Sequence, residues 1–558
     1  MFNHLFSFNA CSKVCCVQAM YEECGPWIVT LILSLQLCFV LRSPMPLLYT
    51  VMCEFAFLAF LSAKMFLLFD APNRPQPLLE SRTWEDVVDN VWSSQETLEE
   101  KRNFVMGWFY DKSFEDLRHE DALVYLAWMR YGSLLEHLSS DELQSLKELD
   151  LARLESEVNE GKPLPRRRVE EEQLGSMKFS LEELRYRHKP LIFYLLTHGA
   201  NSILISSLLR DIGFSYTPAD DKSSLGYWHR PAKSTTSQTS APLVFAHGVG
   251  GQAFYYSLIN DIAAEADGDI ILLDLPFVSL VINDEVPSVV SQVESVTHIL
   301  DKTIGCDTKA TFAGHSYGTT ILSWMVQAQP DRVSNVVFMD PICFQLHLKD
   351  ILFKFHFERS DASTAKGKCS EIDFDKIANP LSVSGLTNLA GSEMHTNMAM
   401  FRHFPWATIE LWPKDIANKG IDASIMLSEY DEIVPSLEVV KQINRFNAET
   451  REFGGDSEKT YDWSEFLKNG YTQEQGTVSA DLLKGAVHGS IVFDEEFRAR
   501  ATSNVISMIR ETKSKSTAYF PSQYSSFANL FASNSAPLAD IPTQAATAWS
   551  GATSFLWN

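Results

Sequence analysis

The sequence is poor in cysteine beyond its N-terminal segment, lacks a glycosylation signal and carries no excess of positive charge. Six of its nine cysteines lie within the first 53 residues, and only Cys306, Cys343 and Cys369 remain for the rest of the 558-residue chain. Thiols spread so thinly do not form a disulfide framework. No N-x-S/T triplet occurs either, so we expect the catalytic part of the chain to face the cytosol.

Acidic residues outnumber basic ones, which excludes one class of partner. The chain holds 47 lysines and arginines against 71 aspartates and glutamates, a formal net charge of −24. A nucleic-acid backbone requires a basic surface that neutralises its phosphates, so we expect no nucleic-acid partner. The one basic cluster, the arginines at 166–168, is followed by glutamates at 170–172 and is interpreted as a locally neutralised linker.

Two long apolar runs occur near the N-terminus. Residues 27–41 form an uncharged run that is a little short for a membrane-spanning helix, and residues 47–69 form a second run that is long enough. The second run contains Lys64, which we expect to snorkel to the membrane interface, and Glu54, which should face a partner helix or the headgroups. Two topologies fit this pattern: a helical hairpin with both ends on one side, or a single span with the first run at the interface.

Acidic residues ahead of the first apolar run argue against a secretory signal peptide. Glu22 and Glu23 stand where such a peptide carries positive charge, and no small-residue cleavage site follows the run. We therefore expect a membrane anchor, with membrane lipid as a partner. The juxtamembrane cysteines are either S-palmitoylated or unmodified thiols; they are Cys11, Cys15, Cys16 and Cys24.

Changes of pattern divide the chain into six segments. We expect a Cys-rich N-terminal segment (1–26), a membrane anchor of one or two helices (27–71), a helical segment (72–160), a linker with lead-in helices (161–224), an α/β domain (225–511) and a disordered tail (512–558). Strands and helices alternate within 225–511, which predicts a mostly parallel sheet with helices on both faces. An apolar insertion at about 344–420 is expected to be a lid.

A serine between two glycines is the most informative motif. Residues 314–318 read G-H-S-Y-G, after a strand-like run at 309–313 and before a helical run at 319–329. This is the strand, tight turn and helix of a nucleophile elbow, in which the serine oxygen stands clear of the sheet. We therefore predict Ser316 as a nucleophile.

A glycine-rich loop lies upstream of the serine and fits an oxyanion hole. Residues 247–251 read H-G-V-G-G, after an apolar strand-like run at 242–246. Such a loop lets backbone N–H groups point at a developing oxyanion without side chains in the way. We expect the N–H groups of Val249 and Tyr317 to be the donors. Four neighbours are expected to line the substrate position: His247, Gly248, Gly250 and His315.

An acid and a base follow the serine in the chain. Asp431 comes just after a strand-like run, and His488 is the only histidine beyond it. The order Ser, Asp, His is that of α/β-hydrolase triads, so we predict Asp431 as the acid and His488 as the base. Asp340 also follows a strand-like run, but Pro341 after it favours a structural turn that binds backbone N–H groups.

Taken together, these motifs resemble an α/β-hydrolase core over residues 225–511. The resemblance includes G-Y-W at 226–228, D-L-P at 274–276 and V-V-F-M-D-P at 336–341. The whole chain is further similar to a poorly characterised group of membrane-anchored eukaryotic α/β-hydrolases, including R-H-F-P-W at 402–406. The triad implies a serine hydrolase that cleaves carboxylic esters without a metal or organic cofactor, and the anchor favours a hydrophobic acyl substrate. An acyltransferase and a catalytically silent scaffold are the alternatives.

Overall fold

The computed structural model describes residues 28, 30–68, 79, 82–182, 184, 186–233, 241–283, 285–354, 392–454 and 476–518. The chain forms two compact units, Met1–Ile509 and Arg510–Asn558. The first unit contains the sheet, all described helices before it, and the insertion. The second is described only where it continues the last helix, α22 (Glu495–Ala518). The tail expected at 512–558 is therefore helical up to Ala518, and the remainder of that tail lies outside the described residues.

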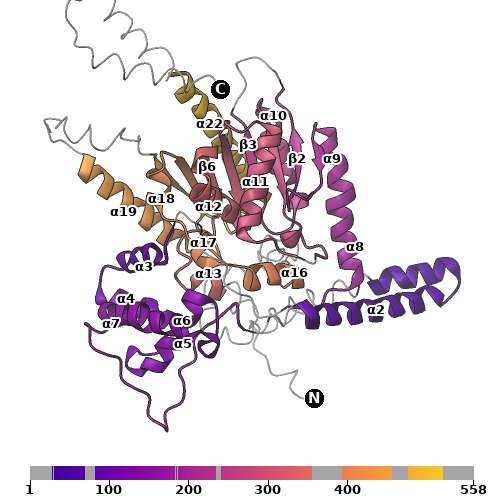
Figure 1. The fold of residues 1–558 in the computed structure, drawn as a ribbon. Helices are drawn as coiled ribbons and strands as arrows, with labels where there is room; N and C mark the ends of the chain where they lie inside the picture. Colours follow the sequence, from indigo (N-terminus) through magenta and orange to yellow (C-terminus); the bar gives the residue numbers. More distant parts are fainter. Residues whose placement is uncertain are drawn as a thin grey trace, which may run out of the picture. The chain divides into compact units, whose positions relative to one another are not determined.

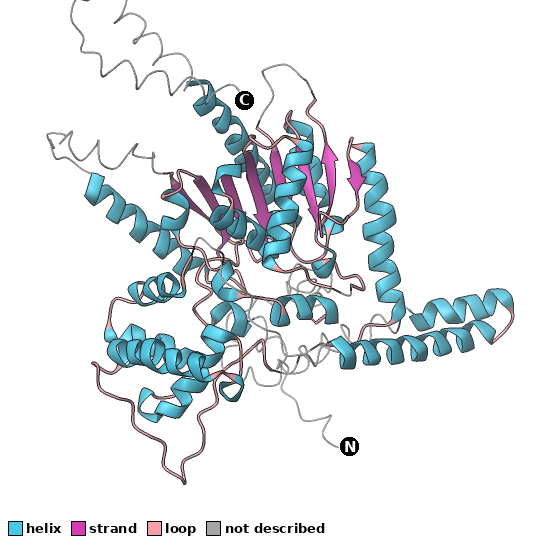
Figure 2. Cartoon of the chain, viewed as in Figure 1, coloured by secondary structure: helices cyan, strands magenta, loops and turns pink. Residues whose placement is uncertain are grey.

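An eight-stranded sheet forms the centre of the first unit (Figures 1 and 2). Its strand order is β1-β2-β4-β3-β5-β6-β7-β8. Strand β2 runs antiparallel to both its neighbours, and the other neighbours pair parallel. The strands are Ser215–Thr217 (β1), Gly226–Arg230 (β2), Leu243–Ala246 (β3), Ile270–Asp274 (β4), Ala310–His315 (β5), Val333–Met339 (β6), Asp422–Ser428 (β7) and Val478–Leu483 (β8).

Helices cover both faces of this sheet (Figure 2). Alternate strand residues enter two hydrophobic clusters: in β6, Val336 and Phe338 belong to one and Val337 and Met339 to the other. The first face packs against α11 (Val289–Thr303), α12 (Thr319–Ala328), α18 (Pro413–Ala417) and α19 (Ser436–Gly454). The second packs against α9 (Ile205–Asp211), α10 (Gln252–Glu265), α21 (Ser490–Phe493) and α22. A parallel sheet buried on both faces requires such near-continuous apolar strands, and the predicted fold class is confirmed.

The helical segment before the sheet shares the hydrophobic core of the first face. Its helices are α3 (Trp84–Ser93), α4 (Leu98–Gly107), α5 (His119–Tyr131), α6 (Ser140–Ser145) and α7 (Ala152–Val158), with a π-helical turn η3 (Leu146–Leu151) and 3-10 turns η1 (Phe114–Asp116) and η2 (Leu135–His137). Capping boxes at Thr83 and Thr97 start α3 and α4 by satisfying the first free N–H groups. The indole of Trp108 donates to the carbonyl of His347, at 3.1 Å, and so joins this segment to the insertion.

The insertion expected at 344–420 is described at its two ends. It holds α13 (Asp350–Phe353), α16 (Met394–Asn397), a π-helical turn η9 (Met398–Arg402), α17 (Trp406–Ile409) and α18. Residues 355–391 lie outside the described residues. Most described side chains of 392–401 are buried, among them Met394, Met400 and Phe401. The described part is therefore packed on the body, and its role as a lid stays a prediction.

The N-terminal apolar runs form two helices, Thr30–Leu41 and α2 (Met45–Leu68). Lys64 is buried, with only 6% of its surface exposed, and its ammonium donates to the Asn283 carbonyl at 2.8 Å. The expectation that Lys64 snorkels to a membrane interface is therefore wrong, because the protein body supplies its polar partners. Both carboxylate oxygens of Glu54 accept from the N–H of Leu191, at 3.1 and 3.0 Å. That residue begins α8 (Leu191–Gly199), so Glu54 does face a partner helix. The cysteines considered for palmitoylation lie outside the described residues.

Candidate active site

Ser316 sits on a strained turn at the carboxyl end of β5. Its φ is 51°, a left-handed conformation that costs a residue with a side chain about 1 kcal/mol or more. The 3-10 turn η6 (Ser316–Gly318) leads directly into α12. A Cβ on Gly318 would stand 2.1 Å from the Ala246 carbonyl oxygen, and one on Gly314 would stand 2.8 Å from Leu322. A side chain at Gly318 would clash with backbone and one at Gly314 would crowd Leu322, so the two glycines let the turn close around the serine.

Three side chains from three loops form a continuous hydrogen-bonded chain. The Nε2 atom of His488 lies 2.9 Å from the Oγ atom of Ser316, and its Nδ1 atom lies 2.8 Å from a carboxylate oxygen of Asp431. Asp431 follows β7, and His488 follows β8. The structure thus brings the three predicted residues together at the carboxyl ends of parallel strands, where ligands bind in open α/β sheets.

Backbone N–H groups fix the carboxylate of Asp431. Its Oδ1 atom accepts from Ile433 at 2.7 Å and from Val434 at 2.8 Å, while Oδ2 faces His488. The side chain of Asp431 has no exposed surface. One oxygen is therefore held by the turn and the other is aimed at the imidazole, which sets the tautomer with Nδ1 protonated and Nε2 free to accept the serine proton.

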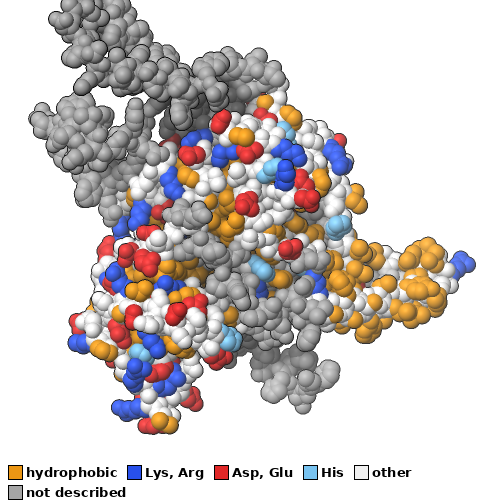
Figure 3. Space-filling view, viewed as in Figure 1, with side chains coloured by type: hydrophobic (Ala, Val, Ile, Leu, Met, Phe, Trp, Pro, Cys, Tyr) orange, Lys and Arg blue, Asp and Glu red, His pale blue; other side chains and the backbone are white. Residues whose placement is uncertain are grey.

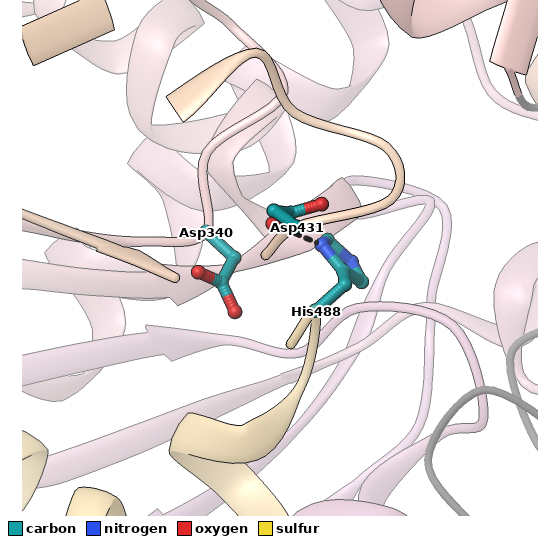
Figure 4. A group of neighbouring side chains, drawn as sticks. All are labelled: Asp340, Asp431 and His488. Atoms are coloured by element: carbon teal, nitrogen blue, oxygen red, sulfur yellow. Dashed lines mark hydrogen bonds and ion pairs between the residues drawn. The ribbon is translucent and has the colours of Figure 1, made fainter. Parts of the chain in front are cut away.

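Asp340 lies beside this chain of hydrogen bonds without joining it (Figure 4). It accepts from the N–H of Ser428 at 2.9 Å and from the N–H of Gly489 at 3.0 Å. Gly489 is the residue after His488, so Asp340 holds the histidine loop. This is the structural role that the following proline favoured. In Figure 4, the dashed line joins His488 to Asp431 alone.

The three groups drawn in Figure 4 also lie close enough to hold a metal ion, since their ligand atoms are within 4.8 Å of one another. Their bonding fits an oriented triad better. Both carboxylates accept at least two backbone N–H groups each, and these donors occupy the lone pairs that an ion would need.

Electrostatics give His488 an unusual proton affinity. Burial opposes its charged form, but the Asp431 carboxylate outweighs burial through its charge and its hydrogen bond, and Asp340 adds to the effect. The pKa of His488 is raised to about 9. Burial has the opposite outcome for His315, whose pKa it lowers. Burial thus dominates at His315, whereas the neighbouring carboxylates dominate at His488, the imidazole that lies within hydrogen-bond distance of Ser316.

The glycine-rich loop touches the serine. A Cβ on Gly248 would stand 2.8 Å from the His315 carbonyl and 3.0 Å from the Cβ of Ser316. The N–H of Gly250 is taken by the Val278 carbonyl, at 2.8 Å. The loop therefore approaches the elbow at Gly248, and the N–H groups of Val249 and Tyr317 stay a prediction as the oxyanion donors.

The two histidines expected to line the substrate are instead buried in the loop's own framework. His247 accepts from the Leu275 N–H at 3.1 Å and lies 2.7 Å from the Gly248 carbonyl. His315 lies 2.8 Å from the hydroxyl of Tyr255. Neither ring has more than 4% of its surface exposed. We interpret both as positioning residues rather than substrate contacts.

Comparison with known proteins agrees with this geometry. A family model described as the alpha/beta hydrolase fold matches residues 241–360. That stretch contains the glycine loop, β5, the elbow and β6. The chain contains an α/β-hydrolase domain. No curated protein matches the chain.

Solved structures are similar to this chain at low identity. Carboxylesterase CesB of Bacillus subtilis is 14% identical, covers 56% of this chain and 98% of its own, and has a TM-score of 0.35. A bacterial membrane phospholipase A is 14% identical over 57% of this chain and 94% of its own, with a TM-score of 0.37. An esterase from Rhizomucor miehei is 13% identical over 58% and 98%, with a TM-score of 0.35. At such scores the likeness has no bearing on substrate.

Two residues of the α/β-hydrolase site have no clear signal in the sequence. Tyr255, within α10, reaches His315 behind the nucleophile, and nothing in the motif around it marks that contact. Asp340 stood out only as a rival acid, although its bond to the Gly489 N–H makes it a support for the base. The strand end and the following proline indicated its turn, but not its partner.

Proposed function

We propose that this chain is a membrane-associated serine hydrolase that cleaves carboxylic esters through an acyl-enzyme. One observation carries the proposal: the unbroken line of hydrogen bonds from Ser316 through His488 to Asp431. A serine is a weak nucleophile until a base takes its proton, and a base needs a fixed tautomer. Both requirements are met by the bonding of these three groups.

The reaction follows from the positions of the atoms. The neutral Nε2 atom of His488 takes the proton as Ser316 Oγ bonds to the ester carbonyl carbon, and the carbonyl oxygen becomes an oxyanion. The proposed N–H donors, Val249 and Tyr317, stabilise it by roughly 3 kcal/mol each. The imidazolium then protonates the departing alcohol. Water, activated by the same imidazole, attacks the acyl-serine and releases the acid.

We propose hydrophobic esters as the substrate class. The apolar helices at the N-terminus would keep the domain beside a membrane, and the described part of the insertion contributes buried apolar side chains, among them Met394, Met400 and Phe401. The scarcity of cysteine outside the anchor supports a domain that faces the cytosol. Transfer of the acyl group to an alcohol other than water would use the same acyl-serine, so the products decide between the two reactions.

Active-site labelling tests the proposal. The purified full-length chain should react with a fluorophosphonate, and mass spectrometry should place the adduct on Ser316. Ser316→Ala should abolish labelling while circular dichroism and melting temperature stay unchanged. Ser436→Ala is a matched control, because Ser436 is a buried serine whose hydroxyl makes no hydrogen bond in the described part of the chain. An adduct on another serine, or none on a folded and soluble chain, would refute the assignment.

A further inference from the structure

The helices Thr30–Leu41 and α2 lie against each other as a hairpin. The hydroxyl of Ser34 donates to the Thr50 hydroxyl at 2.9 Å, across the two arms. Apolar side chains cover the hairpin's outside (Figure 3), with Phe39, Val40 and Phe55 among the most exposed. Figure 1 labels its second arm α2. A soluble surface does not carry so many large apolar groups in one place, which indicates a hydrocarbon environment.

The contacts of α2 limit how far the hairpin can enter a bilayer. The described stretch Thr30–Leu41 of the first arm measures about 18 Å at 1.5 Å per residue. The second arm is bound to the body from Glu54 onward, through Glu54 to Leu191 and through Lys64 to Asn283 and His395. Only about 14 Å of α2, between Met45 and Glu54, extends past these contacts. A hydrocarbon core is about 30 Å thick, so the hairpin reaches roughly half-way.

A second apolar surface adjoins the hairpin. The helical stretch of α8, the π-turn η4 (Ala200–Leu204) and α9 contains no Asp, Glu, Lys or Arg between residues 191 and 209. Its outer face presents Leu195, Leu196, Ile203 and Leu204, which are 58%, 60%, 74% and 56% exposed. We call these four residues the α8 ridge. The stretch could cross a membrane by length and hydropathy, but its inner residues Ile205 and Leu209 pack against the sheet. It therefore offers one face to a partner and cannot be a span.

The hairpin and α8 enclose a groove that suits acyl chains. Its volume is about 560 Å³, and its lining includes Leu33, Leu37, Leu41 and Leu195 together with Glu54, whose carboxylate accepts from the Leu191 N–H. Two of the hydroxyls in it have partners within the hairpin: the Ser34 oxygen lies 2.8 Å from the Thr30 carbonyl as well as 2.9 Å from the Thr50 hydroxyl, and Thr50 donates to the Pro46 carbonyl at 2.9 Å. A surface can face hydrocarbon only if its polar groups are hydrogen-bonded within the protein, because no water is present there to bind them.

We propose that the protein is monotopic: the hairpin enters one leaflet without crossing it, the α8 ridge rests on the same leaflet, and the groove between them holds phospholipid acyl chains. The inference rests on the proposed membrane association and adds its topology and contact surface. Arg42, in the turn between the arms, has a φ of 50°. Half the hydrocarbon core is therefore the greatest depth that the tip can reach, and an oblique insertion keeps the long Arg42 side chain within reach of lipid phosphates of the same leaflet.

Thiol accessibility tests the topology on the full-length chain. The Ser43→Cys variant is synthesised with sealed phosphatidylcholine vesicles and treated with a membrane-impermeant maleimide, either outside or trapped in the lumen. Labelling is read at each cysteine peptide by mass spectrometry. Cys306, exposed on the hydrolase domain, reports the outer side. We expect Cys306 to react from outside, Cys53 to react only after denaturation, and position 43 never to react from the lumen.

Two results of that assay would overturn the topology. Labelling of position 43 from the lumen would mean that the hairpin crosses the bilayer. Rapid labelling of Cys53 from outside, at the rate of Cys306, would mean that the hairpin is not inserted, because Cys53 is exposed in the protein itself.

Vesicle binding tests the ridge. The double variant Leu196→Glu with Ile203→Glu should lower the partition into phosphatidylcholine vesicles about tenfold or more, since each change sets a charge against hydrocarbon. The matched control is Val290→Glu with Leu437→Glu, two residues of similar exposure on α11 and α19. Equal partition of both double variants and the parent would refute the ridge as a contact surface.

Fluorophosphonate labelling separates this inference from the proposed chemistry. A ridge variant that still labels at Ser316 but partitions weakly supports the surface. A parent chain that shows the expected accessibility but does not label leaves the surface standing and refutes the hydrolase reaction.

Discussion

The substitution Asp431→Asn should inactivate the enzyme through the tautomer of His488. In the parent, Oδ1 of Asp431 accepts from the N–H groups of Ile433 and Val434, at 2.7 and 2.8 Å. An asparagine at this position must keep its oxygen there, because an amide NH₂ would face two donors. Its NH₂ then points at Nδ1 of His488, which must become an acceptor, and the proton moves to Nε2. That atom can no longer take the proton of Ser316, and turnover should fall by roughly 10⁴.

Asp340→Asn is the matched comparison, because it makes the same change in another buried carboxylate of the same pocket. Each oxygen of Asp340 accepts from backbone, one from Ser428 and one from Gly489. Either orientation of the amide sets an NH₂ against one donor and should destabilise the fold by about 1–3 kcal/mol. The tautomer of His488 is untouched, so turnover should fall far less than in the Asp431 variant.

The assay measures kcat for a short soluble ester, the rate of fluorophosphonate labelling and the melting temperature of both variants. Asp431→Asn should lose kcat and labelling with little change in melting temperature. Asp340→Asn should lower the melting temperature and reduce kcat and labelling far less. A larger loss of kcat in Asp340→Asn at unchanged stability would refute the reasoning and make Asp340 the triad acid.

Three further outcomes follow from other contacts. The ratio kcat/KM should rise as the pH approaches about 9, because His488 then loses its proton. The free energy of unfolding gained from the raised pKa of His488 should be complete below about pH 6.5 and lost as the pH rises through 9. A pH–rate profile measures the first effect and calorimetry the second, and a kcat/KM that is flat from pH 6 to 9 would contradict the prediction. Gly318→Ala should cost about 3 kcal/mol or more, since its Cβ would stand 2.1 Å from the Ala246 oxygen; urea unfolding measures this, and an unchanged midpoint would contradict it. Lys64→Met removes the donor to Asn283 and His395 and should lower the free energy of unfolding by about 1–3 kcal/mol. The control Lys441→Met, at an exposed ion pair, should change it by less than about 1 kcal/mol. Equal effects of the two substitutions would contradict a stabilising role for the buried Lys64 hydrogen bonds.

Local chemistry explains why the sequence predicted the elbow, the loop and the order of the triad. Glycines on either side of a serine indicate positions where a side chain would be crowded, and Gly314 and Gly318 are crowded in this way in the structure. A last histidine after an acidic turn leaves one candidate for the base. Alternating strands and helices likewise predict the layers of the sheet, since each strand needs apolar neighbours on both faces.

Hydrogen bonds between residues that are distant in sequence could not be predicted in this way. Lys64 looked like a residue at a membrane interface because its neighbours in the chain are apolar, yet it bonds to Asn283 and His395, which belong to other segments. The buried position of His247 was hidden for the same reason. The motif shows its place beside the loop, but its bond to the Leu275 N–H depends on how β4 ends beside β3.

The helix α8 and the turn η4 connect the apolar anchor to the region of the proposed oxyanion hole. While the α8 ridge faces outward, the hydroxyl of Thr197 donates to the Leu280 carbonyl at 2.6 Å, on the inner side. Asn201 donates to the Ser279 carbonyl at 3.2 Å and accepts from the Ala253 N–H at 3.2 Å, in the first turn of α10. A Cβ on Gly251 would stand 2.5 Å from that asparagine oxygen. The residues that close the glycine loop are thus held by the same helix that carries the ridge, because a helix with one polar and one apolar face can satisfy buried carbonyls on one side and hydrocarbon on the other.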